Sequence, residues 1–533
     1  MSSNISADPG PETVSTNPAT GEVLGRSPRD TLETLREKLR RAHAAQPAWA
    51  ETPVNERARA ILRVRDFLVE HTDALAATIS RESGKTRLDA LATEVLPAAM
   101  AASYYARRAE GFLRTRRASA GNWLLAHKAC RIRRVAWGVI GVISPWNYPF
   151  GIPFSEVVMG LLAGNGVVLK VASASQMVGR ALERCFEAAG LPEGLFAYVN
   201  LPGHLAGRAF LEAGIDKLFF TGSVAVGKEL MAKAAETLTP LCLELGGNDP
   251  MLVCPDADLE RAAGGAAWAG MQNCGQSCGG VERIYVHQDV FEPFLKVLGE
   301  KVRGLRVGVD LGDPGEHVDL GAMTTQEQLH TVRRHLQDAL DRGAVIYAQS
   351  ACPDDAPGNF LSATVVVHVD HSMLLMREET FGPVVGVMPV ADMDEAVRLA
   401  NDGPLGLTAS VWSRDRKGAR RLAARLQAGT VTINDHLMSH GLPGTPWGGF
   451  KQSGIGRTHG PLGFAEMTQP QCVVDDLLPG VKKDLWWYPH GPDLYAGLKG
   501  ALDFLYARRP SQRLAGLRRL AKVFPRMWRE GCG

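Results

Sequence analysis

The chain has 533 residues, of which 45% are hydrophobic, enough for two or three domains with large cores. Its formal net charge of only +2 excludes a protein that binds nucleic acid through its overall charge. The 9 cysteines are odd in number and form no Cys-x-x-Cys pair, which argues against a disulfide framework and against a structural zinc site. We therefore expect a metal-free cytoplasmic protein in a reducing compartment.

Neither a secretory signal nor a membrane span is expected. The N-terminal segment, MSSNISADPGPETVSTNP, is polar and has no apolar centre. The most apolar stretch, 150–171, is interrupted by Pro153, Glu156 and Asn165, whereas a spanning helix needs about 20 nearly uninterrupted apolar residues.

The first half of the chain predicts a helical region followed by alternating strands and helices. Residues 32–111 are rich in Ala, Arg, Leu and Glu, which favours helices. Further on, strands are predicted at 135–144, 167–172, 217–223 and 241–247, with helices at 156–163, 176–189 and 226–236. Buried strands that alternate with helices are typical of βαβ units and a mainly parallel sheet.

The same alternation returns in the second half. Strands are predicted at 249–255, 283–288, 364–369, 384–390 and 429–435, with helices that include 394–401 and 417–427. Two successive α/β sheets fit the length of the chain.

The C-terminal segment, 481–533, differs from the rest in charge. It carries 11 Lys and Arg against 4 Asp and Glu, a net charge of +7. Two helical stripes are predicted, one of Leu494, Leu498, Leu502 and Leu505, the other of Leu514, Leu517, Ala521 and Phe524. One interpretation is a docked helix pair with a solvated basic face. The other is a contact with a membrane surface or with another subunit.

Two short motifs suggest chemistries that their surroundings do not support. Gly222–Lys228 matches the spacing of a phosphate-binding P-loop, but Glu229 stands where magnesium binding needs Ser or Thr. The pattern Gly275-x-Ser277-x-Gly279 matches the nucleophile elbow of serine hydrolases, which requires a preceding strand. The residues before it, AAGGAAWAGMQN, favour a helix, so a serine hydrolase is only a remote alternative. No G-x-G-x-x-G follows a strand, so the usual dinucleotide fingerprint is missing.

Five further motifs stand in a fixed order along the chain: PWNYP at 145–149, ELGGN at 244–248, GQSC at 275–278, ETFGP at 379–383, and PWGGFKxSG at 446–454. Each alone is typical of a turn or of a small core residue. Together they closely resemble the aldehyde dehydrogenase superfamily, from Asn17 to Cys472. The segments VERIYV, VDLGAM and HGPLGFAEMT are most similar to succinate-semialdehyde dehydrogenases and broad-range fatty-aldehyde enzymes.

The resemblance implies an α/β fold with two Rossmann-like domains and a small β extension for oligomerisation. The expected segments are an NAD(P)-binding domain at 1–113 and 136–245, a catalytic domain at 246–431, bridging and oligomerisation segments at 114–135 and 432–480, and a basic amphipathic extension at 481–533. It also implies a homodimer or homotetramer.

For the chemistry, the resemblance implies that Cys278 is the nucleophile, because a thiolate can add to a carbonyl and later leave as a thioester. The Asn147 amide and the Cys278 backbone N–H match the pair that stabilises the oxyanion. Glu244 matches the general base that activates water. Enzymes of the family that transfer the acyl group to coenzyme A often lack this carboxylate, so a free acid is favoured over the CoA-acylating alternative. The substrate stays open between succinate semialdehyde and a medium- or long-chain aliphatic aldehyde.

For the cofactor, the resemblance assigns three groups of residues. Pyrophosphate would lie at Gly222, Ser223, Val226 and Gly227, where a helix begins. Trp146, Lys170 and Leu245 match further positions that line the cofactor, and Glu379 and Phe381 match those near the nicotinamide ribose. Strict NAD enzymes of the family often carry Glu where this chain has Ser173. Its absence removes a charge that would repel a 2′-phosphate, so we expect NAD or NADP, with NADP at least tolerated.

Overall fold

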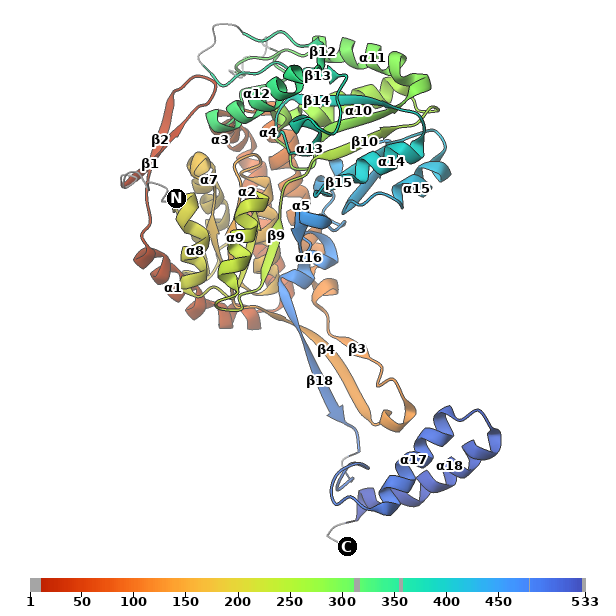
Figure 1. Cartoon of the computed structure of the whole chain (residues 1–533). Helices are drawn as coiled ribbons and strands as arrows, with labels where there is room; N and C mark the ends of the chain where they lie inside the picture. The colour runs from red at the N-terminus through yellow and green to blue at the C-terminus, as the bar shows by residue number, and fades with distance from the viewer. Residues whose placement is uncertain (1–10, 311–316, 354–357, 479, 530–533) are drawn as a thin grey trace, which may run out of the picture. The chain divides into compact units, whose positions relative to one another are not determined.

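The computed structural model describes residues 11–310, 317–353, 358–478 and 480–529 (Figure 1). Residues 1–10, part of the polar segment for which no signal sequence is expected, lie outside these ranges, as do the last four residues of the basic extension. The chain forms two compact units, unit 1 from residues 1–114 and 134–469, and unit 2 from residues 115–133 and 470–533.

Unit 1 begins with a β hairpin and a series of helices, in agreement with the helical composition of 32–111. The capping box between Thr31 and Thr34 starts the first long helix. The elements are β1 (Glu12–Thr16), β2 (Val23–Pro28), α1 (Leu32–Glu51), α2 (Val54–Glu70), α3 (Thr72–Ser83), α4 (Arg87–Ala90), η1 (Leu91–Val95) and α5 (Leu96–Leu113).

The first sheet in the described part of unit 1 has six strands in the order β17-β9-β8-β5-β6-β7. Its strands are β5 (Val139–Ile143), β6 (Gly166–Lys170), β7 (Phe196–Tyr198), β8 (Lys217–Thr221), β9 (Leu241–Glu244) and β17 (Gly454–Ile455). Its helices are α6 (Gly151–Ala163), η3 (Ser173–Ser175), α7 (Gln176–Glu187), α8 (Gly203–Ala213) and α9 (Val224–Ala234). Five strands are parallel, as predicted, and the short β17 adds an antiparallel sixth.

Both faces of this sheet are buried, which is why its strands appear in the sequence as continuous apolar runs. Ile140 and Val142 of β5 pack with α2, α5, α6 and α7, whereas Val139 and Ile143 pack with α1, α8 and α9. Such a doubly wound sheet leaves its carboxyl edge free for a ligand.

The second sheet in the described part of unit 1 has seven strands in the order β12-β13-β14-β11-β10-β15-β16, all parallel to their neighbours except β12. The strands are β10 (Asp249–Val253), β11 (Val281–His287), β12 (Val345–Gln349), β13 (Thr364–Val367), β14 (Val384–Val390), β15 (Thr408–Trp412) and β16 (Thr430–Ile433). The α-helices are α10 (Leu259–Met271), α11 (Phe291–Arg303), α12 (Gln326–Asp341), α13 (Leu374–Arg377), α14 (Met393–Asn401) and α15 (Arg416–Ala423). The later helix α16 (Gly460–Glu466) packs against α5 and α6 of the first sheet. Shorter turns are η4 (Gln272–Gly275), η5 (Gln288–Val290), η6 (Met438–Gly441) and η7 (Lys451–Ser453).

All the predicted strands are present, so the expectation of two α/β sheets is confirmed. The predicted helix at 156–163 begins earlier, at Gly151, because Pro153 is tolerated in the first turn of a helix. The boundary expected between residues 245 and 246 falls between β9 and β10, and as a domain boundary it stays a prediction.

Unit 2 contains a three-stranded sheet and a helical hairpin, and the sheet order is β18-β4-β3. Its elements are β3 (Arg116–Ala118), η2 (Trp123–Leu125), β4 (Lys128–Ala136), β18 (Thr468–Asp476), α17 (Pro492–Tyr506), α18 (Pro510–Val523) and η8 (Phe524–Trp528), with the first residues of β18 and the last of β4 lying in unit 1. Among the described residues, no helix combines the length and the hydropathy that a membrane span requires.

The two helices of the hairpin pack through only part of the predicted stripes, since Leu494 is buried and Leu498 and Phe524 pack against the same apolar cluster. A Cβ atom on Gly500 would lie 2.6 Å from the backbone oxygen of Gly516, so these glycines allow the helices to approach closely. Leu520 of α18, which lies outside the predicted stripes, is buried at this interface, whereas Leu502, Leu514 and Leu517 of those stripes are exposed.

Candidate active site at the junction of two cavities

A strained turn presents Cys278 in front of β11. After α10 the backbone takes positive φ angles at three consecutive residues, Asn273 (54°), Cys274 (54°) and Gly275 (66°). A side chain at Gly275 would meet the backbone oxygen of Gly382 at 2.1 Å, so only glycine fits here. Left-handed backbone at non-glycine residues costs energy and is concentrated at functional sites. Because this turn follows a helix rather than a strand, it lacks the strand–turn–helix order of a hydrolase elbow.

Two cavities lie beside Cys278. Among the described residues, Cys278 is the one that lines both of them. The first cavity, of about 260 Å³, is lined by Ala92, Thr93, Pro97, Tyr148, Gly151, Ile152, Trp268, Gln272, Ser277, Cys278, Leu437, Met438, His440, Gly441 and Trp447. The second, of about 220 Å³, is lined by Pro145, Trp146, Asn147, Thr221, Gly222, Ser223, Glu244, Leu245, Gly246, Cys278, Gln328, Glu379 and Phe381. A group bound in either cavity can therefore reach the same sulfur.

The chemical character of the two cavities differs. No Lys, Arg, Asp or Glu is found among the described residues that line the first cavity, whereas the second holds two carboxylates. His440 of the first cavity adds no charge near neutral pH, because burial lowers its pKa to about 4. The first cavity is thus an apolar, partly aromatic chamber, and the second is polar.

Asn147 is fixed from both its side chain and its backbone. Its amide nitrogen donates to the backbone oxygen of Gln276 at 3.0 Å, directly beside the Cys278 turn. Its backbone oxygen accepts from Asn273 Nδ2 at 2.9 Å and from Lys85 Nζ at 2.7 Å. An amide nitrogen has two N–H donors, and only one is used in the Gln276 contact.

A buried ion pair supports the loop that carries Asn147. Lys85 Nζ and Glu94 Oε1 are 2.6 Å apart, and both side chains are fully buried. Glu94 also accepts from the backbone nitrogens of Phe150 at 2.7 Å and Gly151 at 3.0 Å, at the start of α6. The loop after β5 is therefore fixed to α6 as well as to the Cys278 turn.

Glu244, the last residue of β9, places its carboxylate in the second cavity. The side chain is buried, and neither carboxylate oxygen has a hydrogen-bond partner among the described residues. Burial raises its pKa well above the usual value, the charge of Glu156 adds to the rise, and Arg457 opposes it. A carboxylate with a raised pKa is a stronger base than an exposed one.

The thiol of Cys278 is held in its neutral form in the free protein. Burial raises its pKa above the usual value, and the nearby carboxylates of Glu379, Asp249 and Glu244 raise it further. Formation of the thiolate therefore requires a base or a positive charge brought into the site.

A helix begins at the wall of the second cavity. Ser223 is the N-cap of α9, and its Oγ accepts from the backbone nitrogen of Val226 at 3.4 Å. Gly227 faces Leu245, which would lie 2.9 Å from a Cβ atom at that position. The free N–H groups and dipole of such a helix start favour a bound phosphate.

Opposite this helix, a loop holds Glu379 and Phe381. Glu379 accepts from the backbone nitrogen of Gly247 at 3.0 Å, and burial raises its pKa to about 8. The Phe381 ring meets Trp146 edge to face at 5.5 Å. The buried Glu282 fixes the loop by accepting from the backbone nitrogens of Thr380 at 3.0 Å and Phe381 at 2.7 Å.

The structure brings together most of the predicted site residues. The second cavity collects Cys278, Asn147, Glu244, Trp146, Gly222, Ser223, Leu245, Glu379 and Phe381. Lys170, Ser173, Val226 and Gly227 do not line it: Lys170 is buried at the end of β6, where burial lowers its pKa to about 8, and Ser173 is exposed at the start of η3.

Several residues of the site were not assigned from the sequence. Gln328 lines the second cavity from α12, and its amide donates to the backbone oxygen of Thr380 at 2.8 Å. Nothing in the sequence around Gln328 indicates this position. Tyr148 and Trp447, in contrast, stand inside two of the five motifs and could have been assigned to the cavity.

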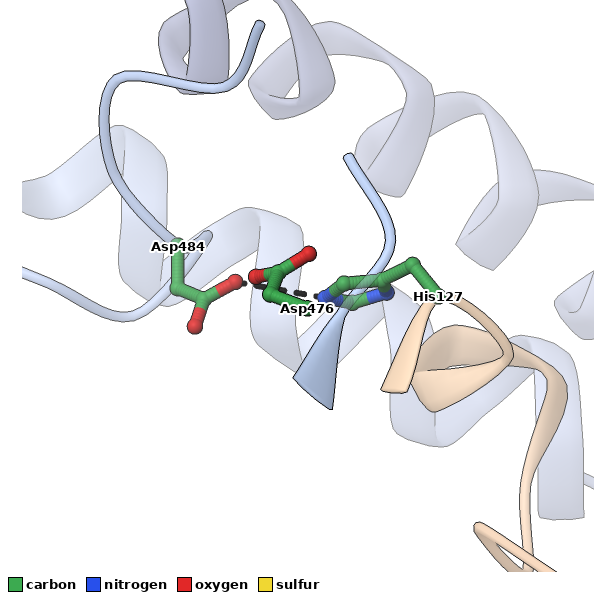
Figure 2. Close-up of side chains that lie close together, drawn as sticks. All are labelled: His127, Asp476 and Asp484. Carbon is green, nitrogen blue, oxygen red and sulfur yellow. Dashed lines mark hydrogen bonds and ion pairs between the residues drawn. The ribbon is translucent and has the colours of Figure 1, made fainter. Parts of the chain in front are cut away.

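A second group of ionisable side chains lies in unit 2, where His127, Asp476 and Asp484 come within reach of one another (Figure 2). Lys128 Nζ lies 2.6 Å from Asp476 and 2.8 Å from Asp484, and so supplies the positive charge between the two carboxylates. The group is a salt-bridge cluster and gives no reason to place a metal ion there.

Comparisons with known proteins match nearly the whole chain. The model of the aldehyde dehydrogenase family matches residues 5–473. A 4,4′-diapolycopene aldehyde oxidase from a Methylomonas species is 39% identical over 490 residues, which cover 92% of this chain and 90% of the relative. A putative NADP-dependent succinate-semialdehyde dehydrogenase from Mycobacterium ulcerans is 38% identical, covering 88% and 90%. The crystal structure of an NAD-dependent aldehyde dehydrogenase from Sinorhizobium meliloti is similar with a TM-score of 0.83 and 32% identity, covering 89% and 93%.

Proposed function

Since this chain belongs to the aldehyde dehydrogenase family, and thus acts on an aldehyde with NAD or NADP, we propose that Cys278 is its covalent nucleophile and that its substrate is a long apolar aldehyde. The observation that carries the proposal is the position of Cys278 between an apolar cavity and a polar one. The aldehyde would enter through the first cavity and the cofactor would occupy the second.

The residues around the sulfur suit the first half of the reaction. Addition of the Cys278 thiolate to the aldehyde carbon forms a thiohemiacetal, whose oxygen carries the negative charge. The second N–H of the Asn147 amide and the Cys278 backbone N–H are the donors for that oxygen. Loss of one such donor typically costs about 2.7–4 kcal/mol of transition-state stabilisation.

The walls of the second cavity fit a nicotinamide dinucleotide. The Ser223-capped start of α9 suits the pyrophosphate, and the carboxylate of Glu379 suits ribose hydroxyls. Bound NAD(P)⁺ supplies the acceptor for the hydride that leaves the thiohemiacetal carbon. The sulfur of Cys278 then retains the acyl group as a thioester.

Glu244 completes the cycle in this proposal. Its carboxylate takes a proton from water, the hydroxide adds to the thioester carbon, and the carbon–sulfur bond breaks to release the carboxylic acid and the Cys278 thiolate. A carboxylate in the cavity that contains Cys278 supports hydrolysis over transfer to coenzyme A.

The first cavity favours an apolar substrate over succinate semialdehyde. The distal carboxylate of succinate semialdehyde would need a cation or several donors when buried, and the described lining provides no Lys or Arg. The names of the relatives point to two substrate classes, and the lining favours the class of the Methylomonas protein, whose named substrate is an apolar aldehyde.

A chain-length series tests this choice. We expect kcat/KM to rise from hexanal to decanal by up to about fourfold per methylene, because each buried CH₂ contributes roughly 0.8 kcal/mol. Met438→Arg places a cation in the lining of the first cavity and should lower kcat/KM for decanal and raise kcat/KM for succinate semialdehyde. The control Met438→Leu should leave both values of kcat/KM unchanged. A wild-type enzyme that prefers succinate semialdehyde to decanal would refute the substrate assignment and leave the role of Cys278 untouched.

We also propose that the chain forms a homodimer or homotetramer through the small sheet of unit 2. The strand β18 lies at the edge of that sheet and exposes Val473 and Val474. An exposed edge strand with apolar side chains readily pairs with another chain. Light scattering at micromolar concentration should give a multiple of the 57.5 kDa chain mass, and a monomer would contradict the proposal.

A further inference from the structure

The helical hairpin of unit 2, formed by α17 and α18 (Figure 1), leaves several apolar side chains exposed. On α17, Tyr495, Leu502 and Tyr506 follow one another at i, i+7 and i+11 and are more than half exposed. On α18, Leu514 and Leu517 are 52% and 38% exposed, whereas Gly516, Leu520 and Val523 are buried. Each helix therefore carries an apolar stripe that nothing in the described part of unit 2 covers.

Positive charge accompanies these stripes. Arg518 and Lys522 lie one and two turns after Leu514, at the edge of its stripe, and both are exposed. Among the acids of this segment, Asp484 pairs with Lys128 and Asp503 with Arg519, while Asp493 is exposed at the start of α17. Residues 481–533 keep a net charge of +7.

Aromatic side chains gather on the same unit. Trp123, Trp486 and Trp528 line a hollow of about 230 Å³ together with Phe524 and Met527. The three tryptophans are 46%, 40% and 53% exposed. Trp and Tyr are enriched where a bilayer meets water, because their rings are apolar and their N–H and O–H groups are polar.

We propose that this hairpin surface, formed by Tyr495, Leu502, Leu514, Leu517, Arg518 and Lys522, binds the surface of an anionic lipid bilayer. Helices that combine a basic face with Leu, Tyr and Trp lie in the bilayer interface without crossing it. Neither helix is long enough to span, since α17 has 15 residues and α18 has 14. A second copy of the chain is the poorer occupant, because it would bring the same positive charge to the contact, whereas anionic lipid complements it. The inference does not depend on the identity of the aldehyde.

Vesicle sedimentation of the full-length protein tests the proposal. We expect binding to vesicles of phosphatidylcholine with 30% phosphatidylglycerol, weaker binding in 0.5 M than in 0.1 M NaCl, and little binding to phosphatidylcholine alone. Each Lys or Arg near an anionic surface strengthens binding by about fivefold, so Arg518→Gln with Lys522→Gln should weaken it by about 25-fold. Leu514→Ser with Leu517→Ser should weaken it through the loss of apolar contact.

Two controls make the outcome specific to the hairpin. Lys417→Gln with Arg420→Gln removes two exposed cations from α15 in unit 1 and should leave binding unchanged. All variants should keep wild-type activity on a water-soluble aldehyde, which shows that they fold. Equal binding to neutral and anionic vesicles, no binding to either, or an equal loss in the α15 control would overturn the proposal. The proposal would also be overturned if the protein did not bind vesicles but self-associated, and if Leu514→Ser with Leu517→Ser abolished that self-association.

Discussion

Glu156 offers a sharp test of the electrostatics at the site, because it is a buried acid in the middle of α6. Its side chain is 3% exposed, and its Oε2 atom has no hydrogen-bond partner among the described residues. Burial raises its pKa to about 8. The substitution Glu156→Gln keeps the size of the side chain and removes the ionisation.

The sign and size of the effect follow from the difference in proton binding. An unfolded glutamate loses its proton near pH 4.5, whereas the folded protein keeps this proton until about pH 8. The higher proton affinity of the folded state therefore adds to the free energy of unfolding. This contribution is fully present below pH 4.5 and is lost as pH rises from 4.5 to 8. The loss is about 1.4 kcal/mol per pH unit, or about 5 kcal/mol over the whole window.

Thermal melts of wild type and Glu156→Gln between pH 5 and 8 measure this contribution. The variant should become progressively more stable relative to wild type as pH rises, while the exposed α2 control Glu70→Gln should give a constant difference. A stability difference that does not change with pH, or one that falls as pH rises, would refute the reasoning.

Three further outcomes are expected. Cys278→Ala should abolish reduction of NAD(P)⁺ and retain cofactor binding by fluorescence titration, and residual dehydrogenase turnover would remove the mechanism. Ser173→Glu should shift the ratio of kcat/KM for NADP and NAD towards NAD, since a carboxylate repels a 2′-phosphate at close range; a wild-type enzyme about a hundredfold selective for NAD would contradict this account. Lys85→Ala should destabilise the protein by about 3–5 kcal/mol, because it leaves the Glu94 charge buried without its partner. An unchanged melting temperature in that variant would show that the pair does not support the Asn147 loop.

The parts of the site that sequence could predict are those carried by short continuous motifs. Cys278, Glu244 and Glu379 each stand at a strand end or in a loop, inside one of five motifs that are informative when taken together. The alternation of apolar runs and helices also predicted the two sheets, because buried parallel strands appear as continuous apolar runs, although β7, β12 and β15 were not predicted.

The remainder depends on tertiary contacts. Lys85, in the loop after α3, and Glu94, in η1, act on the site only through their contacts with the loop after β5, and Gln328 reaches the cavity from a helix far along the chain. The hairpin stripes show a related limit. Periodicity locates an apolar stripe at Leu514 and Leu517, but Gly500 and Gly516 decide which side of α18 becomes buried.

The most direct test of the central claim is a search for the acyl group on Cys278. Glu244→Gln enzyme is mixed with decanal and NADP⁺, quenched with acid, digested and analysed by mass spectrometry. The account predicts a burst of reduced cofactor close to one per site and a decanoyl group on the peptide that contains Cys278, because the variant forms the thioester but cannot activate water. A decanoyl group on Ser277 instead, or steady turnover without any acylated peptide, would contradict it.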